Sequence, residues 1–188
     1  MGLLDPINPL GESGIDVLVC GAVCSRRPDP GTLRTEGRPP CTVVLDREDD
    51  VRFTRTALAS HTPAAGRIVV HPTVASGDRL LWHDILWALG TRCAARLSRE
   101  EGERAVRTAL DATGPCQVTV LRAHRIGPGL WADLVHLHRT TCADLVLVHH
   151  AELPDGLAHL LRHCDYRIVD TFAGMAQLHP PATVSPRP

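Results

Sequence analysis

Short β-branched runs alternate with helix-period segments through the middle of this chain of 188 residues. The runs are nearly continuous in apolar character, as expected of parallel strands that are covered on both faces. They are CTVVL (41–45), RIVVH (67–71), QVTVL (117–121), DLVLV (144–148) and YRIV (166–169). This alternation predicts a three-layer α/β/α domain with a mostly parallel five-stranded sheet and right-handed crossovers.

The segments between the runs carry apolar residues at helical spacing. Ser98 and Glu101 match a capping box, in which each side chain satisfies a free backbone donor of the other, so a helix is predicted to begin there. Leucine spacing predicts further helices within residues 78–89, 130–137 and 157–161. We expect the core to hold the three tryptophans, which are Trp82, Trp87 and Trp131.

Composition divides the chain around this alternation. The Pro- and Gly-containing residues 1–14 predict a flexible leader, and the apolar run 15–23 predicts a buried strand. Residues 25–40 hold four prolines, two glycines and four arginines, which predicts a long exposed loop. Four prolines in residues 180–188 predict a flexible tail. The expected layout is one α/β domain over residues 15–179, and 44% hydrophobic content suits its core.

Charge and cysteine usage limit the function classes. The 20 basic residues are all arginines and face 21 acidic residues, so no global positive field favours nucleic acid, although local arginines can. No run of about 18 apolar residues predicts a membrane span, and residues 1–10 do not have the pattern of a signal peptide. Seven cysteines without regular spacing indicate reduced thiols. We therefore expect a cytoplasmic protein with no membrane contact.

Four stretches resemble a known family. The family is the AAA+ ATPases of the transposition-helper type. Its second strand and helix are resembled by RIVVHPTVASGDRLLWHDILWALG, its Walker B strand by VTVLRAHRI, and its sensor strand by LWADLVHLHRTTCADLVLVHH. The fourth stretch, VVLDREDDVRF, falls at the position of the phosphate loop. The resemblance covers residues 43–170. It implies a P-loop NTPase-like fold. A generic doubly wound α/β domain would give the same order of strands and helices, and this alternative stays open.

The residues that carry ATPase chemistry do not carry over with the resemblance. A working phosphate loop has the form G-x-x-x-x-G-K-[ST], whose backbone and lysine hold the phosphates and whose hydroxyl holds Mg²⁺. The resemblance places Asp46 and Val51 at the glycines, Arg52 at the lysine and Phe53 at the hydroxyl. Side chains at the glycine positions resist the required backbone geometry, and nearby acids repel a triphosphate, which Arg47 and Arg52 offset only in part.

The Walker B and sensor positions are also changed. The resemblance places Leu121 at the aspartate that organises Mg²⁺ and Arg122 at the catalytic glutamate, and neither residue can polarise a water. His149 and His150 stand where this family usually has a small polar residue. We therefore expect no ATP hydrolysis, no catalytic residues of this type and no cofactor.

Two other groups of residues are candidates for function. Arg55, Arg162 and Arg167 fall at positions that, in the resembled family, face a neighbouring subunit or nucleic acid, and arginine suits bidentate contacts with carboxylate or phosphate. A metal hypothesis rests on imidazoles four residues apart on a helix and a nearby thiol. Its residues are His149, His150, His159, His163 and Cys164.

Three functions follow as hypotheses. The first is an inactive AAA+-like binding or regulatory module whose partner is a protein, either an active AAA+ ATPase, a second copy of this chain, or a component of a DNA-mobility or defence complex. The second is a nucleotide sensor that holds phosphate through Arg47 and Arg52 without hydrolysis. The third is a metal-dependent enzyme that uses the histidine and cysteine residues of the metal hypothesis.

Overall fold

The structure is a computed structural model that describes residues 41–73, 79–91, 97–113, 116–141 and 143–180. Four predictions lie wholly or almost wholly outside these residues. They are the flexible leader 1–14, the strand at 15–23, the exposed loop 25–40 and the tail 180–188, of which Pro180 alone is described.

Five parallel strands form one sheet in the order β2-β3-β4-β1-β5. They are β1 (Cys41–Leu45), β2 (Arg67–Val70), β3 (Gln117–Val120), β4 (Asp144–His149) and β5 (Tyr166–Val169). The predicted five-stranded parallel sheet is confirmed. The register pairs Leu45 of β1 with His149 of β4, and Val120 of β3 with Leu147 of β4.

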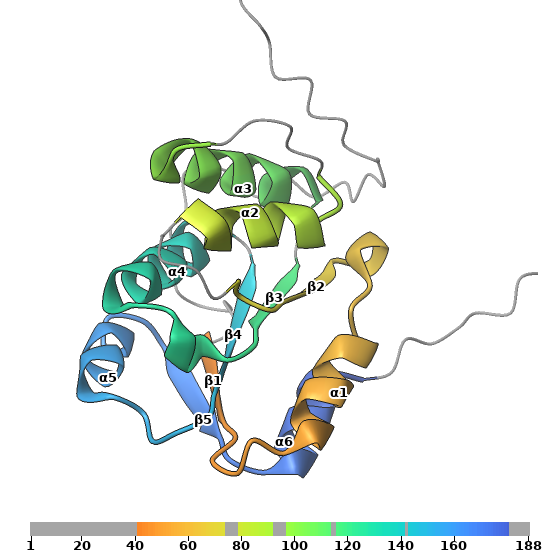
Figure 1. Ribbon diagram of the computed structural model, residues 1–188, viewed down its shortest axis with the longest axis vertical. Helices are drawn as coiled ribbons and strands as arrows, with labels where there is room; N and C mark the ends of the chain where they lie inside the picture. Colours follow the sequence, from red (N-terminus) through yellow and green to blue (C-terminus); the bar gives the residue numbers. More distant parts are fainter. Residues whose placement is uncertain (1–40, 74–78, 92–96, 114–115, 142, 181–188) are drawn as a thin grey trace, which may run out of the picture.

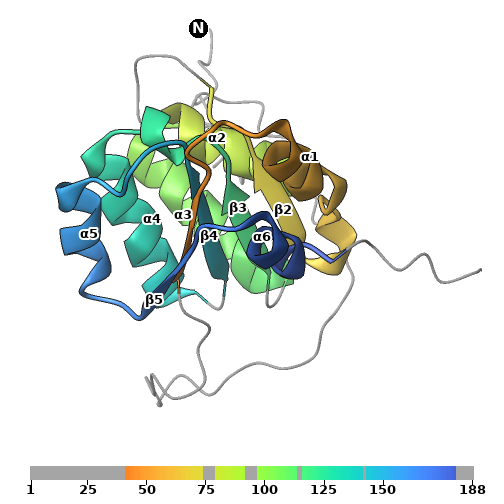
Figure 2. The same ribbon diagram turned by 90° about the horizontal axis from the view of Figure 1, so that it is seen from below.

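Helices cover both faces of the sheet, which confirms the three-layer α/β/α architecture (Figures 1 and 2). One face carries α1 (Val51–Ala59) and α6 (Phe172–Leu178). The other side carries α2 (Arg79–Ala88), α3 (Arg99–Thr113), α4 (Pro128–Thr140) and α5 (Asp155–Leu161). Short 3-10 turns lie at Pro63–Ala65 (η1) and Ala123–Arg125 (η2). Within the described ranges, no helix has both the length and the apolar character needed to cross a membrane.

The alternation of side chains along each strand divides the core into two parts. Val43 and Leu45 of β1 belong to the larger cluster, which α2, α3, α4 and α5 cover. Val44 points to the opposite face and packs in a smaller cluster with Phe53 of α1 and Met175 of α6. Both faces of the sheet are therefore buried, which explains why the strands are apolar at successive positions.

The capping box at the start of α3 is present as predicted. The Ser98 backbone N–H donates to the Glu101 carboxylate at 2.7 Å, and the Glu101 backbone N–H donates to the Ser98 hydroxyl at 3.3 Å. Two of the three tryptophans, Trp82 and Trp131, are buried as expected. The expectation was wrong for Trp87, which is 70% exposed, because the buried face of α2 is supplied by other residues, Leu81, Trp82, Ile85 and Leu86.

Candidate functional site

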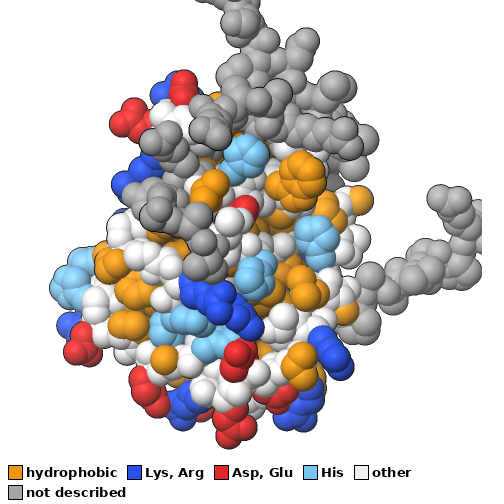
Figure 3. All heavy atoms as spheres, viewed as in Figure 1, with side chains coloured by type: hydrophobic (Ala, Val, Ile, Leu, Met, Phe, Trp, Pro, Cys, Tyr) orange, Lys and Arg blue, Asp and Glu red, His pale blue; other side chains and the backbone are white. Residues whose placement is uncertain are grey.

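Polar side chains gather where β1, β4 and β3 end. Asp46 directly follows β1, and His149 ends β4 with His150 directly after it. Arg122 and His124 follow β3. Because β4 lies between β1 and β3, the carboxyl ends of these parallel strands meet at one edge. In open α/β sheets, ligands bind in the crevice outside this edge. Histidine, acidic and basic side chains also lie side by side on the face shown in Figure 3.

Asp46 is a buried carboxylate that the backbone holds by one oxygen. The residue is 2% exposed, and its Oδ1 accepts a hydrogen bond of 2.8 Å from the Asp50 backbone N–H. Its own backbone N–H donates to the His149 carbonyl at 2.9 Å, which ties the β1 end to β4. Among the described residues, Asp46 Oδ2 has no hydrogen-bond partner. Such an atom is costly to bury, so it marks a position that needs explanation.

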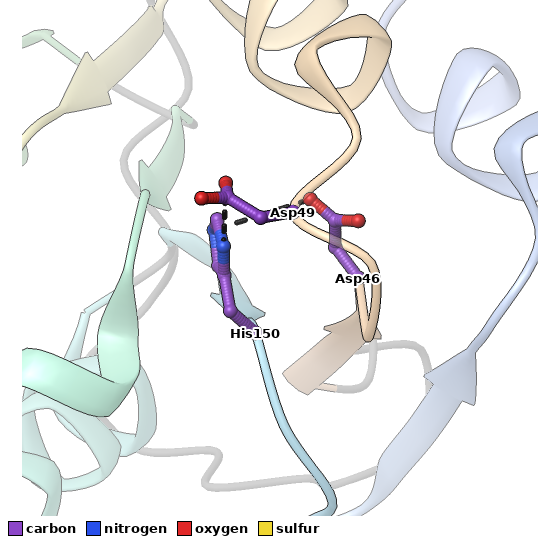
Figure 4. Close-up of side chains that lie close together, drawn as sticks. All are labelled: Asp46, Asp49 and His150. Atoms are coloured by element: carbon purple, nitrogen blue, oxygen red, sulfur yellow. Dashed lines mark ion pairs between the residues drawn. The ribbon is translucent and has the colours of Figure 1, made fainter.

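His150 lies between two aspartates, as Figure 4 shows. Its Nδ1 is 2.7 Å from Asp49 Oδ1, and its Nε2 is 4.0 Å from Asp46 Oδ2. The His150 side chain is 8% exposed, and its Nε2 is buried with no hydrogen-bond partner in the described part of the chain. One potential ligand atom from each of Asp46, Asp49 and His150 lies within 4.8 Å of the other two.

Two backbone positions beside His150 adopt the left-handed conformation. Asp49 has φ 50° and Arg122 has φ 51°, and no other non-glycine residue among those described has a positive φ. The Arg122 guanidinium lies 3.6 Å from Asp49 Oδ2, so the β1–α1 loop and the turn after β3 meet through these two side chains. Left-handed backbone at non-glycine residues costs about 1–3 kcal/mol each and often occurs at functional sites.

Three histidine rings cluster at the same edge. The His124 ring centroid is 5.7 Å from that of His149 and 4.9 Å from that of His150. Burial, followed by the neighbouring histidines and arginines, lowers the pKa of His124, and burial also lowers the pKa of His149. The Ala151 backbone N–H donates to His149 Nδ1 at 3.2 Å, whereas His149 Nε2 is buried and unpartnered among the described groups. A lowered pKa favours the neutral imidazole of His124 and of His149, and a neutral imidazole can accept a proton or bind metal.

The N-terminus of α1 is closed by the chain itself. Asp50 is the N-cap residue and its Oδ1 accepts a hydrogen bond from the Arg52 backbone N–H at 2.8 Å, while Asp46 accepts from the N–H of Asp50. The Arg52 Nε donates to Asp50 Oδ2 at 2.7 Å, and these bonds from Arg52 lower the pKa of the Asp50 carboxyl. Carboxylates therefore occupy the helix end at which phosphate-loop proteins bind phosphate.

The other residues predicted at the nucleotide motifs have different contacts. Phe53 is buried and packs edge-to-face on Phe172, with ring centroids 5.6 Å apart, so it is part of the core. Leu121 is fully buried after β3. Arg47 forms an exposed ion pair with Glu152 at 2.9 Å. Arg47 and Arg52, the two arginines expected to hold phosphate, are each paired with an acid.

The structure does not bring the remaining predicted residues together at this edge. His159 and His163 form an exposed ring pair with centroids 5.6 Å apart, on α5 and just after it. In the described ranges, only Asp46, Asp49 and His150 place three potential metal ligands close together. The three interaction arginines are exposed and belong to different parts of the chain, with Arg55 on α1, Arg162 just after α5 and Arg167 on β5. Arg167 Nε donates to Thr42 Oγ1 at 2.9 Å.

Sequence reasoning named Asp46 and His150 but did not join them. Asp46 was identified by its place in the degenerate phosphate loop, and His150 by the histidine pair at the end of a predicted strand. The signal that could have joined them is that parallel strands end at one edge of a sheet. Their direct contact also required β1 and β4 to be neighbours, which the alternation of elements does not specify.

A second feature is an open pocket of about 420 Å³ between α1, β2 and α2. Its lining residues are Leu58, His61, Val69, Val70, His71, Asp84, Trp87 and Ala88. Two large apolar side chains of this lining face solvent, since Leu58 is 51% and Trp87 is 70% exposed. Exposed tryptophan beside a pocket is typical of protein interaction surfaces.

No protein-family model matches the chain, and a search of curated proteins finds no match. The fold and the site define an all-parallel α/β/α domain with a carboxylate and histidine cluster at the carboxyl edge of its sheet. This edge and the exposed pocket are the two features of the described residues that bear on function.

Proposed function

We propose that this chain is a cytoplasmic, non-hydrolysing AAA+-like module that acts by binding a protein partner. The observation that carries the proposal is the closure of the α1 N-terminus, where Asp46 and Asp50 take up backbone donors that would bind phosphate. A helix end that is already capped by carboxylates offers a nucleotide fewer free N–H groups and a weaker positive field.

The layout of the sheet supports the resemblance on which the proposal rests. The strands that correspond to the Walker A, sensor and Walker B strands are β1, β4 and β3, and they are adjacent in the sheet. The residues at the corresponding positions, Asp46, His150 and Arg122, therefore reach the same edge. None of them is the residue that ATP hydrolysis needs at its position.

Electrostatics also oppose nucleotide binding. Asp46, Glu48, Asp49 and Asp50 lie together in the loop between β1 and α1. Two like charges 4 Å apart repel by roughly 1 kcal/mol in water and roughly 4 kcal/mol near a protein surface. Arg47 and Arg52, which would offset this repulsion, are engaged by Glu152 and Asp50. The nucleotide-sensor alternative is therefore less well supported than a binding module.

The pocket beside Trp87 supports binding to a protein. Tryptophan is enriched in the energetically dominant positions of protein interfaces, and charged residues are depleted there. Trp87 and Leu58 offer apolar area at the pocket rim. The exposed arginines Arg55, Arg162 and Arg167 lie on α1, just after α5 and on β5, and we do not assign them to one nucleic-acid surface.

A thermal-shift titration tests the loss of nucleotide binding. The full chain is melted with Mg-ATP, Mg-ADP or MgCl2 alone, because a ligand that binds only the folded state raises the Tm as its concentration passes the Kd. We expect millimolar nucleotide to leave the Tm at the value in MgCl2. A nucleotide-dependent rise that disappears in the double charge reversal Arg47→Glu, Arg52→Glu would instead establish the sensor function.

Sedimentation velocity tests whether the pocket beside Trp87 binds a second copy of this chain. We expect the wild-type chain to self-associate as its concentration rises, and we expect Trp87→Ser to shift the distribution toward monomer. Asp111→Ser, an exposed change on α3 outside the pocket lining, is the matched control. Association that is unchanged by Trp87→Ser would remove this pocket as the interface. A wild-type chain that stays monomeric would contradict self-association.

A further inference from the structure

Two side chains at the carboxyl edge share an arrangement that the closed phosphate loop does not require. Asp46 is held through Oδ1 by the Asp50 backbone N–H, and His150 is held through Nδ1 by Asp49. In each case the second polar atom, Asp46 Oδ2 or His150 Nε2, is buried and has no hydrogen-bond partner among the described residues. These two free atoms lie 4.0 Å apart.

We infer that Asp46 Oδ2 and His150 Nε2 bind one divalent transition-metal ion, and that Asp49 positions the His150 ring. Bonds from zinc to carboxylate oxygen or imidazole nitrogen are about 2.0–2.2 Å long, so two ligands of a tetrahedral ion lie about 3.3–3.6 Å apart. The two atoms lie 4.0 Å apart in this structure. Closing this separation by roughly 0.5 Å, through small side-chain rotations, gives the tetrahedral spacing without rearrangement of the strands.

The contacts of the two ligands match those of metal sites in proteins. A metal-binding histidine almost always donates its other N–H to a carboxylate, a carbonyl or water, which fixes its tautomer and orientation. Asp49 Oδ1 at 2.7 Å from His150 Nδ1 supplies this contact. Ligating carboxylates are themselves hydrogen-bonded, as Asp46 is through the Asp50 N–H. The Arg122 guanidinium beside Asp49 holds the positioning carboxylate from its other oxygen.

The donor set selects the class of ion. One imidazole and one carboxylate suit Zn²⁺ and its first-row neighbours, whereas Ca²⁺ takes six to eight oxygen ligands. Water completes the coordination, because two side-chain ligands leave positions open. His124 and His149 stand next to this site, with His124 4.9 Å from the His150 ring. Both imidazole rings line the site, and neither is a ligand in this arrangement.

The metal site does not depend on the proposed partner binding. The metal site lies at the carboxyl ends of the neighbouring strands β1 and β4, whereas the apolar pocket lies between α1, β2 and α2. The chain can therefore bind metal without self-associating, or self-associate without binding metal. The metal titration and the sedimentation experiments test the two proposals separately.

Metal titration of the full chain tests the inference. Protein treated with a chelator and then dialysed is titrated with Zn²⁺ by isothermal titration calorimetry and with Co²⁺ by visible absorption. We expect one ion to bind with the weak visible bands of nitrogen and oxygen ligands. Asp46→Asn and His150→Gln should each lower the affinity more than about 100-fold, beyond the 10–100-fold loss typical of outer-shell changes. Asp49→Asn should lower it about 10-fold and leave the Co²⁺ spectrum unchanged in shape.

The control is the double variant His159→Ala, His163→Ala, which removes the exposed histidine pair on and just after α5 and should bind as the wild type does. Asp46→Asn retains an oxygen that can accept from the Asp50 N–H, and a thermal melt checks its fold. If it does not fold, His150→Gln decides. The inference is overturned if the wild type binds no ion, or if affinity falls only in the α5 double variant. A strong near-ultraviolet thiolate band that persists in His150→Gln would also overturn it.

Discussion

His179 is a buried imidazole at the end of α6, 3% exposed, with Nδ1 2.8 Å from the Ser60 hydroxyl. Burial, with a smaller effect from the charge of Arg67, lowers its pKa from the usual 6.5 to about 4. Between these two values the unfolded chain binds more protons than the folded chain, so the free energy of unfolding falls as the pH is lowered. This contribution is fully present above pH 6.5 and is lost by about pH 4.

Urea unfolding at several pH values measures this effect. We expect the wild type to lose about 1–3 kcal/mol between pH 7 and pH 4.5 through His179 alone. His124 and His149, whose pKa values are also lowered, add to the loss with the same sign. His179→Asn keeps a polar partner for Ser60 and cannot titrate, so its stability should depend less on pH. Equal pH dependence in both proteins would contradict the assignment.

Gly102 is the contact point between helices α3 and α2. A Cβ at this position would lie 2.8 Å from the Trp82 Cβ, and Trp82 is itself buried against the sheet. Gly102→Ala should therefore destabilise the fold by about 1–3 kcal/mol through overpacking, although alanine favours a helix by about 1 kcal/mol over glycine.

Gly156 on α5 provides the matched control, because a Cβ there meets no atom within 4 Å. Gly156→Ala should leave stability unchanged or raise it by up to about 1 kcal/mol. Chemical denaturation of both variants beside the wild type gives the comparison. A Gly102→Ala protein as stable as Gly156→Ala would mean that α2 and α3 can separate at no cost.

Strands were easier to predict than helices, for a physical reason. The predicted boundaries of β1 and β5 are those of the structure, because each is a short apolar run whose neighbours cannot continue it. Helix α6 was not predicted, since its seven residues, FAGMAQL, bury only Met175 and so leave little periodic signal. Residue type alone predicts a buried Trp87, but Trp87 lies outside the buried face of α2.

At the scale of the whole molecule, strand order limits what the sequence can predict. β1 lies between β4 and β5, and Thr42 is opposite both Val146 and Arg167. These pairings join residues more than 100 positions apart, and no local pattern encodes them. The degenerate phosphate loop could therefore be recognised residue by residue, whereas the contact of Asp46 with His150 depends on the folded sheet.

The same topology predicts that the C-terminal elements are needed for the N-terminal half to fold. A chain that ends at Asp165 lacks β5, which pairs with β1, and α6, whose Met175 covers the cluster around Val44 and Phe53. We expect this chain to lose cooperative thermal unfolding and to bind a dye for exposed apolar surface, because one edge and one face of β1 would be open to water. Circular dichroism melts and dye fluorescence measure both.

A chain that ends at Pro180 is the control, since it keeps every described element, including the carbonyl that accepts from Arg67. It should melt at the wild-type temperature. If the chain ending at Asp165 also melts cooperatively at that temperature, then the cluster that α6 covers does not contribute to global stability. Loss of cooperativity in the shorter chain alone would mean that β1, with the loop that carries Asp46, is fixed in place only when strands from both ends of the domain have paired.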